Sequence, residues 1–519
     1  MEEHARAMMT YLHQFPIYKQ TGWEETSDPL PFMEFALLFG TCVFLFEYYL
    51  DFRQLRKFQT ATQIPKELAG NELVPVDKFE KSLDYGKDKF SFGLIQGLLM
   101  FVEGTVLLCY GYLPYAWDLA TSLALTYGLF VEQSDAHSAA EASSPLRKEV
   151  AITIVFVFIM SLHDMLVGLP FSLYSTFVVE ERHGFNKSTL ALFLKDKLLM
   201  ILLMVVIGTP VFSAMIYVIR VSGEQFYFYV WAFLCVVSIL LMTVYPVYIA
   251  PLFNDYKKLD AGPVFEAIRQ LAERQDVQFP LTQIYEVDGS KRSAHSNAYF
   301  FGFFKNKRIV LYDTLLEQVD IPEVQAILGH EMGHWKLWHS LQGFLITQAY
   351  TLALFLAFST VIHNRAMFAS FGFADAAARG EDMPVFIGLV IFTQTLWAPV
   401  DKILTFLVNC NSRVNEFAAD EFSQQLGYGS ELCSGLIKIS VENLGSMVPD
   451  SWYSVYHYSH PPLVERLRAV QKLDKLAGKS PATKPTFAAP AANDKSADVS
   501  VSPAVSPKTR SKRDTKKSK

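Results

Sequence analysis

Two histidines and a glutamate lie within five positions of the stretch Val324 to Leu337, which reads VQAILGHEMGHWKL. The apolar periodicity of this stretch predicts a helix. On such a helix His330 and His334 are one turn apart, so both imidazoles can bind one Zn²⁺ ion, and Glu331 is placed to polarise a water molecule at the metal. The spacing favours metal-dependent hydrolysis. The alternative is a pair of helix histidines that bind no metal.

A catalytic zinc site needs a third protein ligand, usually another histidine or a carboxylate. The segment NSRVNEFAADEFSQQL, residues 411–426, is also helical by its pattern and places Glu416 and Asp420 one turn apart. Glu416 can be the third ligand, and Asp420 can accept the outer N–H of a ligating imidazole and fix its tautomer. Acidic pairs at this spacing also occur on solvated helix faces, so the assignment depends on the histidine motif.

Hydrolysis of a peptide bond also needs a hydrogen-bond donor for the oxyanion that forms at the carbonyl. In the segment SHPPLVER, residues 459–466, either His460 or Arg466 could supply it. The alternative is a turn followed by an ordinary surface arginine. Trp335 and His339 follow the second histidine of the motif, and for both a role in the core or at the rim is favoured.

The segment SAHSNAYFFGFF, residues 293–304, is rich in aromatic residues and strand-like. The basic turn Lys305 to Arg308 and the strand IVLY follow it, so the two strands are expected to form a hairpin. An edge strand beside the zinc helix can hold an extended peptide by backbone hydrogen bonds. The alternative is an interior hairpin without such a role.

The elements that must position these residues are mostly membrane helices. Of 519 residues, 51% are hydrophobic and 14% aromatic, while 19% are charged, against about 25% charged in typical soluble domains. Apolar stretches of about 20 residues, long enough to cross a bilayer, occur at Pro31 to Leu50, Phe90 to Leu113, Val150 to Pro170, Leu198 to Arg220, Phe226 to Tyr248, Leu341 to Ile362 and Val385 to Val408.

The distribution of Lys and Arg orients these spans. Basic residues follow the first span and lie in the loop 171–197, so the N-terminus is expected in the lumen and the C-terminus in the cytosol. The resulting organisation is a lumenal segment 1–30, spans one to five over 31–248, spans six and seven over 341–408, a cytosolic protease domain in two parts, 249–340 and 409–477, and a disordered basic tail 478–519. The only sequon, at Asn186, then faces the cytosol and stays unmodified.

Several ionisable residues lie inside the spans, and such residues usually face the bundle interior or water. Paired or snorkelling side chains near helix ends are favoured for Glu34 and Lys402, and a hydrated interior cavity for Glu103 and the pair His163 and Asp164. A net charge of −6 predicts no nucleic-acid partner. Five cysteines without a CxxC pair argue against a disulfide framework.

Taken together, the motifs resemble the CAAX prenyl protease 1 family of integral-membrane zinc endopeptidases. The resemblance covers about 80% of the chain and includes the following segments in order: FEKSLDYGKDKFSF, LPFSLYSTFVVEERHGFNKSTL, YPVYIAPLFN, SAHSNAYFFG, HEMGHWKL, SRVNEFAAD and SHPPLVERL. It implies a mainly α, polytopic fold, in which seven transmembrane helices form a barrel around a hydrated chamber. A gluzincin-like protease domain with a small hairpin or sheet lies on the cytosolic side.

The resemblance also implies roles for single residues. His330, His334 and Glu416 bind one zinc ion per chain, and Glu331 is the general base and then the acid. It further implies the following roles for the remaining positions: Asp420 orients a ligand, His460 and Arg466 assist substrate or oxyanion binding, and Asn297 and Ala298 offer backbone contacts to substrate.

The implied substrates are prenylated CaaX proteins, from which the last three residues are removed. The implied location is the endoplasmic-reticulum membrane, with the inner nuclear membrane as a second site. The terminal sequence KKSK is similar to a dilysine retrieval signal, or else is a solvated basic tail. Two rival functions are a protease that degrades misfolded membrane proteins and a non-catalytic membrane scaffold.

Overall fold

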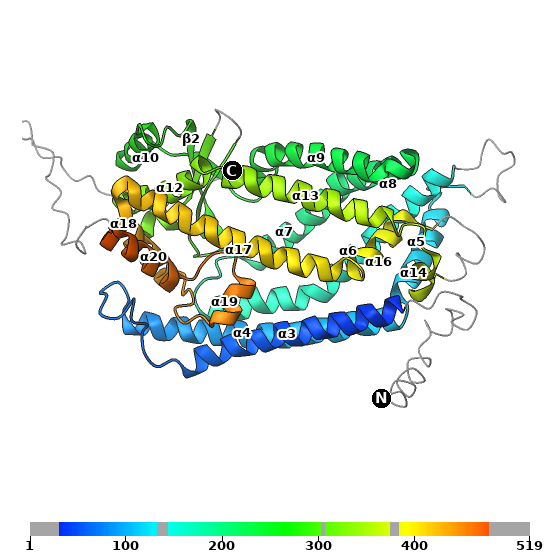
Figure 1. The fold of residues 1–519 in the computed structure, drawn as a ribbon, viewed down its shortest axis with the longest axis horizontal. Helices are drawn as coiled ribbons and strands as arrows, with labels where there is room; N and C mark the ends of the chain where they lie inside the picture. Colours follow the sequence, from blue (N-terminus) through cyan, green and yellow to red (C-terminus); the bar gives the residue numbers. More distant parts are fainter. Residues whose placement is uncertain (1–30, 132–143, 303–306, 374–382, 477–519) are drawn as a thin grey trace, which may run out of the picture.

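The computed structural model describes residues 31–131, 144–302, 307–373 and 383–476. The expected lumenal segment 1–30 and the basic tail with its KKSK end lie outside these residues. The described chain is mostly helical (Figure 1). The start of α3 lies at the right end of Figure 1 and α20 at the left end, so the described chain begins and ends at opposite ends of the molecule.

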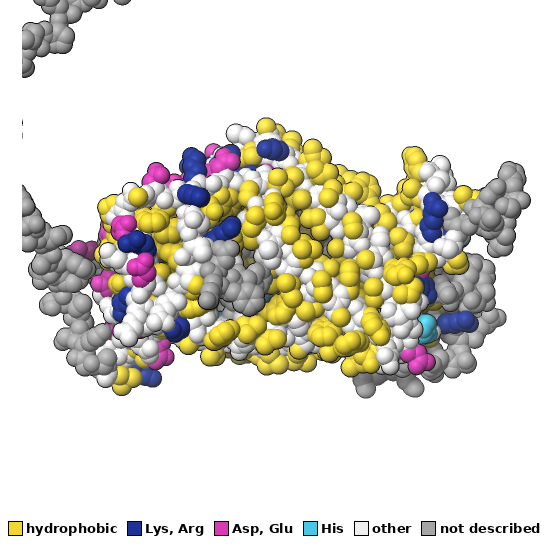
Figure 2. Space-filling model, turned by 90° about the horizontal axis from the view of Figure 1, so that it is seen from above, with side chains coloured by type: hydrophobic (Ala, Val, Ile, Leu, Met, Phe, Trp, Pro, Cys, Tyr) yellow, Lys and Arg dark blue, Asp and Glu magenta, His cyan; other side chains and the backbone are white. Residues whose placement is uncertain are grey.

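Within the described ranges, six helical segments are long and apolar enough to cross a membrane, and a bent pair makes a seventh. The six are α3 (Phe32–Thr60), α4 (Val76–Cys109), α6 with η1 (Pro145–Glu180), α7 with η2 and α8 (Leu190–Val221), η3 with α9, η4 and η5 (Gly223–Leu252), and α13 (His339–Ser359). The predicted spans are confirmed. Figure 2 shows apolar side chains over the middle of the molecule and charged ones toward its two ends, as a bilayer requires.

The seventh span is broken, which the sequence analysis did not expect. It consists of α16 (Val385–Gln394) and α17 (Ala398–Ser423), and the chain bends by 63° between them. Pro399 lies at the start of α17, where its missing N–H is tolerated, whereas it would interrupt a continuous helix. After this break α17 runs without interruption past residue 408, so one helix reaches from the membrane into the segment that contains Glu416.

The spans form a ring in chain order. Contacts join α3 to α4, α4 to η1, α6 to α8, α8 to α9 and α9 to α13. Gln342 of α13 forms hydrogen bonds with Asn411 and Asn415 of α17. Lys402 of α17 forms an ion pair with Glu47 of α3 at 2.6 Å, which connects the last span to the first. The predicted barrel is therefore closed by a polar pair between α17 and α3. The hydrated chamber inside it stays a prediction.

The sequence analysis favoured paired or snorkelling side chains for Glu34 and Lys402. Lys402 is paired, whereas Oε1 of Glu34 is buried and has no hydrogen-bond partner among the described residues. Lys402 is held by Glu47, which also accepts a hydrogen bond from Tyr456 at 2.9 Å. Near the other end of the barrel, His163 contacts Glu103 at 3.2 Å and Asp164 at 3.3 Å. Pairing of this kind lowers the cost of keeping ionisable groups inside a membrane protein.

A further helix, α5 (Tyr112–Thr126), lies between the second and third spans, where the sequence analysis placed no element. Ala116, Ala120 and Ala124 line one side of it and are fully buried. Small residues at this spacing allow two helices to approach closely, and α5 packs along α6. It extends the wall of the barrel at the end opposite the histidine motif (Figure 1).

A small mixed sheet stands at the other end. Its strands are β1 (Tyr256–Lys258), β2 (Leu281–Val287), β3 (Ala298–Phe301) and β4 (Lys307–Tyr312), in the order β1-β2-β4-β3. Only β2 and β4 are parallel. The predicted hairpin is confirmed as β3 and β4, with Lys307 and Arg308 inside β4 rather than in the turn. Since β3 pairs only with β4, it is an edge strand.

The remaining helices surround this sheet and the end of α17. They are α10 (Pro263–Glu273), α11 (Asp313–Gln318), α12 (Ile321–Lys336), α18 (Gly429–Glu442), α19 (Ser451–His457) and α20 (Leu463–Leu476), with the short helices η6 (Gly289–Lys291), η7 (Gln424–Tyr428) and, at the far end, α14 (Arg365–Ser370). One hydrophobic core joins the sheet to α10 and α12, through Ile284, Ile309, Ile268, Val324 and Leu328. This core fixes α12 against the sheet.

Candidate metal centre

The helix with the histidine motif begins at a strong capping box. At the start of α12, the side chain of Asp320 accepts a hydrogen bond from the backbone N–H of Glu323, and the side chain of Glu323 accepts one from the backbone N–H of Asp320. Glu323 is buried, and its carboxylate also accepts a hydrogen bond from the Lys438 ammonium of α18 at 2.8 Å. Ser434 bonds to the same carboxylate. These contacts fix the start of α12, three turns before the histidines.

Two glycines of α12 let α17 approach closely. A Cβ atom on Gly333 would lie 3.1 Å from the Phe422 ring and 3.2 Å from Cα of Ala419. One on Gly329 would lie 3.1 Å from Oγ of Ser423, which instead donates to the carbonyl of Ala326. The glycine inside the motif HEMGH therefore has a structural purpose, because it allows the histidines to reach the carboxylates of α17.

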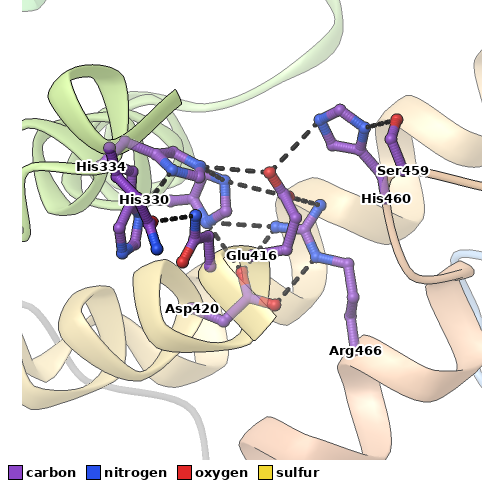
Figure 3. Close-up of polar contacts among 10 residues, drawn as sticks. His330, His334, Glu416, Asp420, Ser459, His460 and Arg466 are labelled. Carbon is purple, nitrogen blue, oxygen red and sulfur yellow. Dashed lines mark hydrogen bonds and ion pairs between the residues drawn. The ribbon is translucent and has the colours of Figure 1, made fainter. Parts of the chain in front are cut away.

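The three predicted metal ligands converge. His330, His334 and Glu416 offer ligand atoms that all lie within 4.8 Å of one another. The two Nε2 atoms are 3.2 Å apart, His334 Nε2 is 3.2 Å from Glu416 Oε1, and His330 Nε2 is 3.5 Å from Glu416 Oε2. Figure 3 shows the three side chains pointing toward one another from α12 and α17.

These distances fit a metal ion. Ligand atoms at 2.0–2.1 Å from zinc in tetrahedral geometry lie roughly 3.4 Å apart, close to the separations between these side chains. Glu416 is 5% exposed, and its Oε2 atom has no hydrogen-bond partner among the described residues. A buried carboxylate oxygen left without a donor is costly, and a bound cation removes that cost.

The outer nitrogen of His330 contacts an acidic partner. His330 Nδ1 lies 2.9 Å from Asp420 Oδ1, and Arg466 contacts the same carboxylate through Nε at 2.8 Å and through Nη2. Arg466 Nη2 is also 3.2 Å from His330 Nδ1, but a guanidinium only donates, so both groups donate to Asp420. Asp420 is thus where the sequence analysis expected it, oriented by an arginine.

Burial and the charge of Arg466 each lower the pKa of His330, whereas the neighbouring carboxylates of Asp420 and Glu416 raise it. The carboxylates outweigh the other two, and the pKa rises to about 9 without a metal. An imidazole in this acidic surrounding attracts a cation, either a proton or a metal ion. The neighbouring Glu331 has a raised pKa, because burial disfavours its charged form more than the two imidazoles favour it.

The outer nitrogen of His334 contacts a residue that sequence reasoning placed in the core or at the rim. His334 Nδ1 lies 2.9 Å from Nδ1 of His339. A spacing of five residues does not place two side chains on one helix face. The contact exists because α12 ends and α13 begins between them, with Trp338 in the left-handed conformation at φ 63°. No sequence pattern signals such a break.

The two candidates for the oxyanion donor lie in different surroundings. His460 is exposed over 70% of its side chain and its Nε2 lies 3.3 Å from Glu416 Oε1. Arg466 is exposed over only 12% and is engaged by Asp420. The loop with His460 is fixed by Arg413 of α17, which bonds to Ser454 and, at 2.6 Å, to Glu465. Of the two side chains, His460 is therefore the more accessible.

Asn297 and Ala298 lie at the start of the edge strand. The carbonyl of Asn297 accepts from the amide of Tyr312 on β4 at 3.1 Å. The side chain of Asn297 turns back and accepts from the amide of Ala298 at 2.8 Å. Strand β3 also contacts α12. An edge strand thus lies beside the helix that contributes the two histidines, as the sequence analysis expected.

A ring of membrane helices that supports a two-histidine, one-carboxylate site with a glutamate beside it defines a membrane metallopeptidase. The family models agree. Residues 54–255 match the CAAX prenyl protease N-terminal region with five membrane helices, and residues 259–474 match peptidase family M48.

Relatives and a solved structure resemble nearly the whole chain. A CAAX prenyl protease 1 homolog from Oryza sativa subsp. japonica is 42% identical over 86% of this chain and 98% of its own length. The homolog from Homo sapiens is 39% identical over 84% and 95%. The crystal structure of S. mikatae Ste24p is 34% identical, with a TM-score of 0.76 over 85% of this chain and 100% of that one. The chain belongs to the CAAX prenyl protease 1 family and is a metalloendopeptidase.

Proposed function

We propose that this protein is a zinc-dependent endopeptidase that removes the C-terminal aaX tripeptide from prenylated CaaX proteins. The observation that supports this most strongly is where the metal centre lies. Helix α13, a membrane span, begins three residues after α12 ends, and α17, part of the seventh span, contains Glu416. The candidate ligands therefore lie next to the ends of membrane-spanning helices.

A prenyl substrate suits that location. Each buried CH₂ of a lipid chain contributes about 0.8 kcal/mol to membrane binding, so the chain holds the neighbouring peptide bond at the membrane surface. The relatives in rice, mouse and human are named CAAX prenyl protease 1 homologs. The name and the position of the site together favour prenylated CaaX proteins over soluble peptides.

The site residues divide the chemistry of hydrolysis. Zinc held by His330, His334 and Glu416 would polarise the substrate carbonyl and lower the pKa of a water toward about 7. Glu331 takes a proton from the attacking water as the new carbon–oxygen bond forms. It passes that proton to the departing amine as the carbon–nitrogen bond breaks.

The supporting residues act around that step. His460, exposed and next to Glu416, donates to the oxyanion. Asp420 accepts from His330 and keeps its Nε2 free for the metal, and Arg466 orients Asp420. Asn297 and Ala298 would offer backbone contacts to the extended peptide at the start of β3. These contacts would use groups other than the Asn297 carbonyl, which accepts from Tyr312, and the Ala298 amide, which donates to the Asn297 side chain.

We propose that the protein lies in the endoplasmic-reticulum membrane. The protease domain, residues 249–340 and 409–477, is then on the cytosolic side and the N-terminus is in the lumen. The basic residues after the first span and in the loop 171–197 support this orientation. The sequon at Asn186 would then face the cytosol and stay unmodified. The side-chain amide of Asn186 donates to Glu181 at 3.0 Å, and Asn186 pairs with Ser293 next to the sheet. An asparagine engaged in this way is a poor acceptor for a glycan.

The test is cleavage of one CaaX peptide in farnesylated and unprenylated forms, with removal and return of zinc by a chelator. We expect cleavage of the farnesylated peptide only, lost with chelator and restored by zinc. Glu331→Gln is the matched control, which retains metal and fold but not turnover. Equal cleavage of both peptides would support a quality-control protease instead, and zinc binding without any cleavage would support a scaffold.

A further inference from the structure

The two histidine ligands have outer partners of different kinds. For His330 the partner is the carboxylate of Asp420, whose charge is balanced by Arg466. For His334 it is the imidazole of His339, at 2.9 Å between the two Nδ1 atoms. The rings of His334 and His339 are inclined at 70°, with centroids 5.1 Å apart. His339 thus meets the edge of the His334 ring at its outer nitrogen.

The direction of this hydrogen bond follows from the other nitrogen of His334. Its Nε2 faces His330 and Glu416, at 3.2 Å from each. A nitrogen that binds a metal has no proton, so the proton of a neutral His334 is on Nδ1. Nδ1 therefore donates and His339 Nδ1 accepts. Only this tautomer pair satisfies both the hydrogen bond and the metal.

His339 is held in place from two sides. On its N-terminal side, Trp338 adopts a left-handed conformation at φ 63°, which is unfavourable for a non-glycine residue. On its C-terminal side, Gln342, one turn further along α13, bonds to Asn411 at 3.2 Å and Asn415 at 2.8 Å on α17. The second asparagine directly precedes Glu416. The start of α13 is thus tied to the helix that holds the third ligand.

We propose that His339 is a positioning residue that accepts a hydrogen bond from His334, sets its tautomer and orients its Nε2 toward the metal. This inference rests on the proposed zinc site and adds a neutral counterpart to Asp420. It also joins a membrane span to the metal centre, because His339 is the first residue of α13. Displacement of that span would turn or release a metal ligand.

The test is the zinc affinity of apoprotein in detergent, measured by chelator competition, for the whole chain and two variants. His339→Leu replaces the imidazole by an apolar side chain that cannot accept a hydrogen bond. We expect the zinc dissociation constant of this variant to rise by about 10–100-fold. His339→Asn restores an acceptor oxygen and is expected to stay within about threefold of wild type. Spectra with cobalt in place of zinc should change for the leucine variant and not for the asparagine variant.

The control is Ser340→Ala, at the exposed next position of the same helix turn. It is expected to bind zinc like wild type, and an equal loss in this variant would overturn the proposal by assigning the effect to the start of the helix. Unchanged affinity in His339→Leu would also overturn it, as would an equal loss in the two His339 variants. If wild type binds no zinc, the proposed function fails; if wild type and His339→Leu bind equally, only this inference fails.

Discussion

Asp420→Asn should damage both stability and metal binding, because one carboxylate serves two neighbours. Asp420 is 1% exposed and accepts from His330 and from two nitrogens of Arg466. An asparagine offers one acceptor oxygen and turns a donating amide toward either the imidazole or the guanidinium. Among the described residues, the ion-pair contact then left to Arg466, which is exposed over 12% of its side chain, is Glu416 at 3.8 Å.

The magnitude follows from that loss. Removal of one partner of a buried pair costs about 3–5 kcal/mol, and the remaining contact to Glu416 places the expected destabilisation at the lower end. Loss of the outer partner of a histidine ligand weakens zinc binding by about 10–100-fold, or roughly 1.4–2.7 kcal/mol. We therefore expect a lower thermal midpoint of the apoprotein and a weaker zinc complex.

Thermal unfolding of the apoprotein and chelator competition measure the two effects separately. The control is Asp77→Asn, whose pair with Lys81 at 3.2 Å is more than 60% exposed on both sides and should contribute no more than about 1 kcal/mol. A stable Asp420→Asn variant with wild-type zinc affinity would refute the assignment of Asp420 and, with it, the position of Arg466 behind the site.

Further predictions concern four positions. Glu331→Gln should keep its zinc while peptide cleavage falls at least about 100-fold; wild-type cleavage would remove this residue as the base. Gly333→Ala should weaken zinc binding and lower the thermal midpoint, because the added methyl would lie 3.1 Å from α17; unchanged values would contradict the close helix contact. His460→Ala should lower turnover and retain zinc; zinc loss would make His460 a ligand. Asp450→Asn should lower the thermal midpoint, since burial raises the pKa of Asp450 but its arginine partner lowers it further. The difference from wild type should persist above pH 3.8 and disappear as the pH falls through the lowered pKa; a difference that does not depend on pH would contradict this.

The spans and the chemical motifs could be predicted because they depend on local pattern. A run of about 20 apolar residues has few structural solutions other than a membrane helix, and two histidines four residues apart share one helix face. Glu416 was found by counting ligands, since two histidines leave a zinc site incomplete. The aromatic-rich, strand-like segment after His295, followed by a basic turn and the strand IVLY, likewise predicted the hairpin at the sheet edge.

Other features depend on contacts between distant segments. Helix α17 joins a membrane span to the third ligand without a break, and a division between membrane and soluble residues at 408 conceals this. The choice between His460 and Arg466 required their burial, which spacing does not determine. His339 meets His334 only because a left-handed residue separates two helices. Each of these features results from tertiary packing or an unusual backbone angle, and neither leaves a periodic signal.

The zinc content of purified protein tests the metal site most directly. Elemental analysis should find one zinc ion per chain in wild type and in Glu331→Gln, and close to none in Glu416→Ala, with the same helix content in all three. Full zinc retention in Glu416→Ala, or no zinc in folded wild type, would contradict a metal held jointly by α12 and α17.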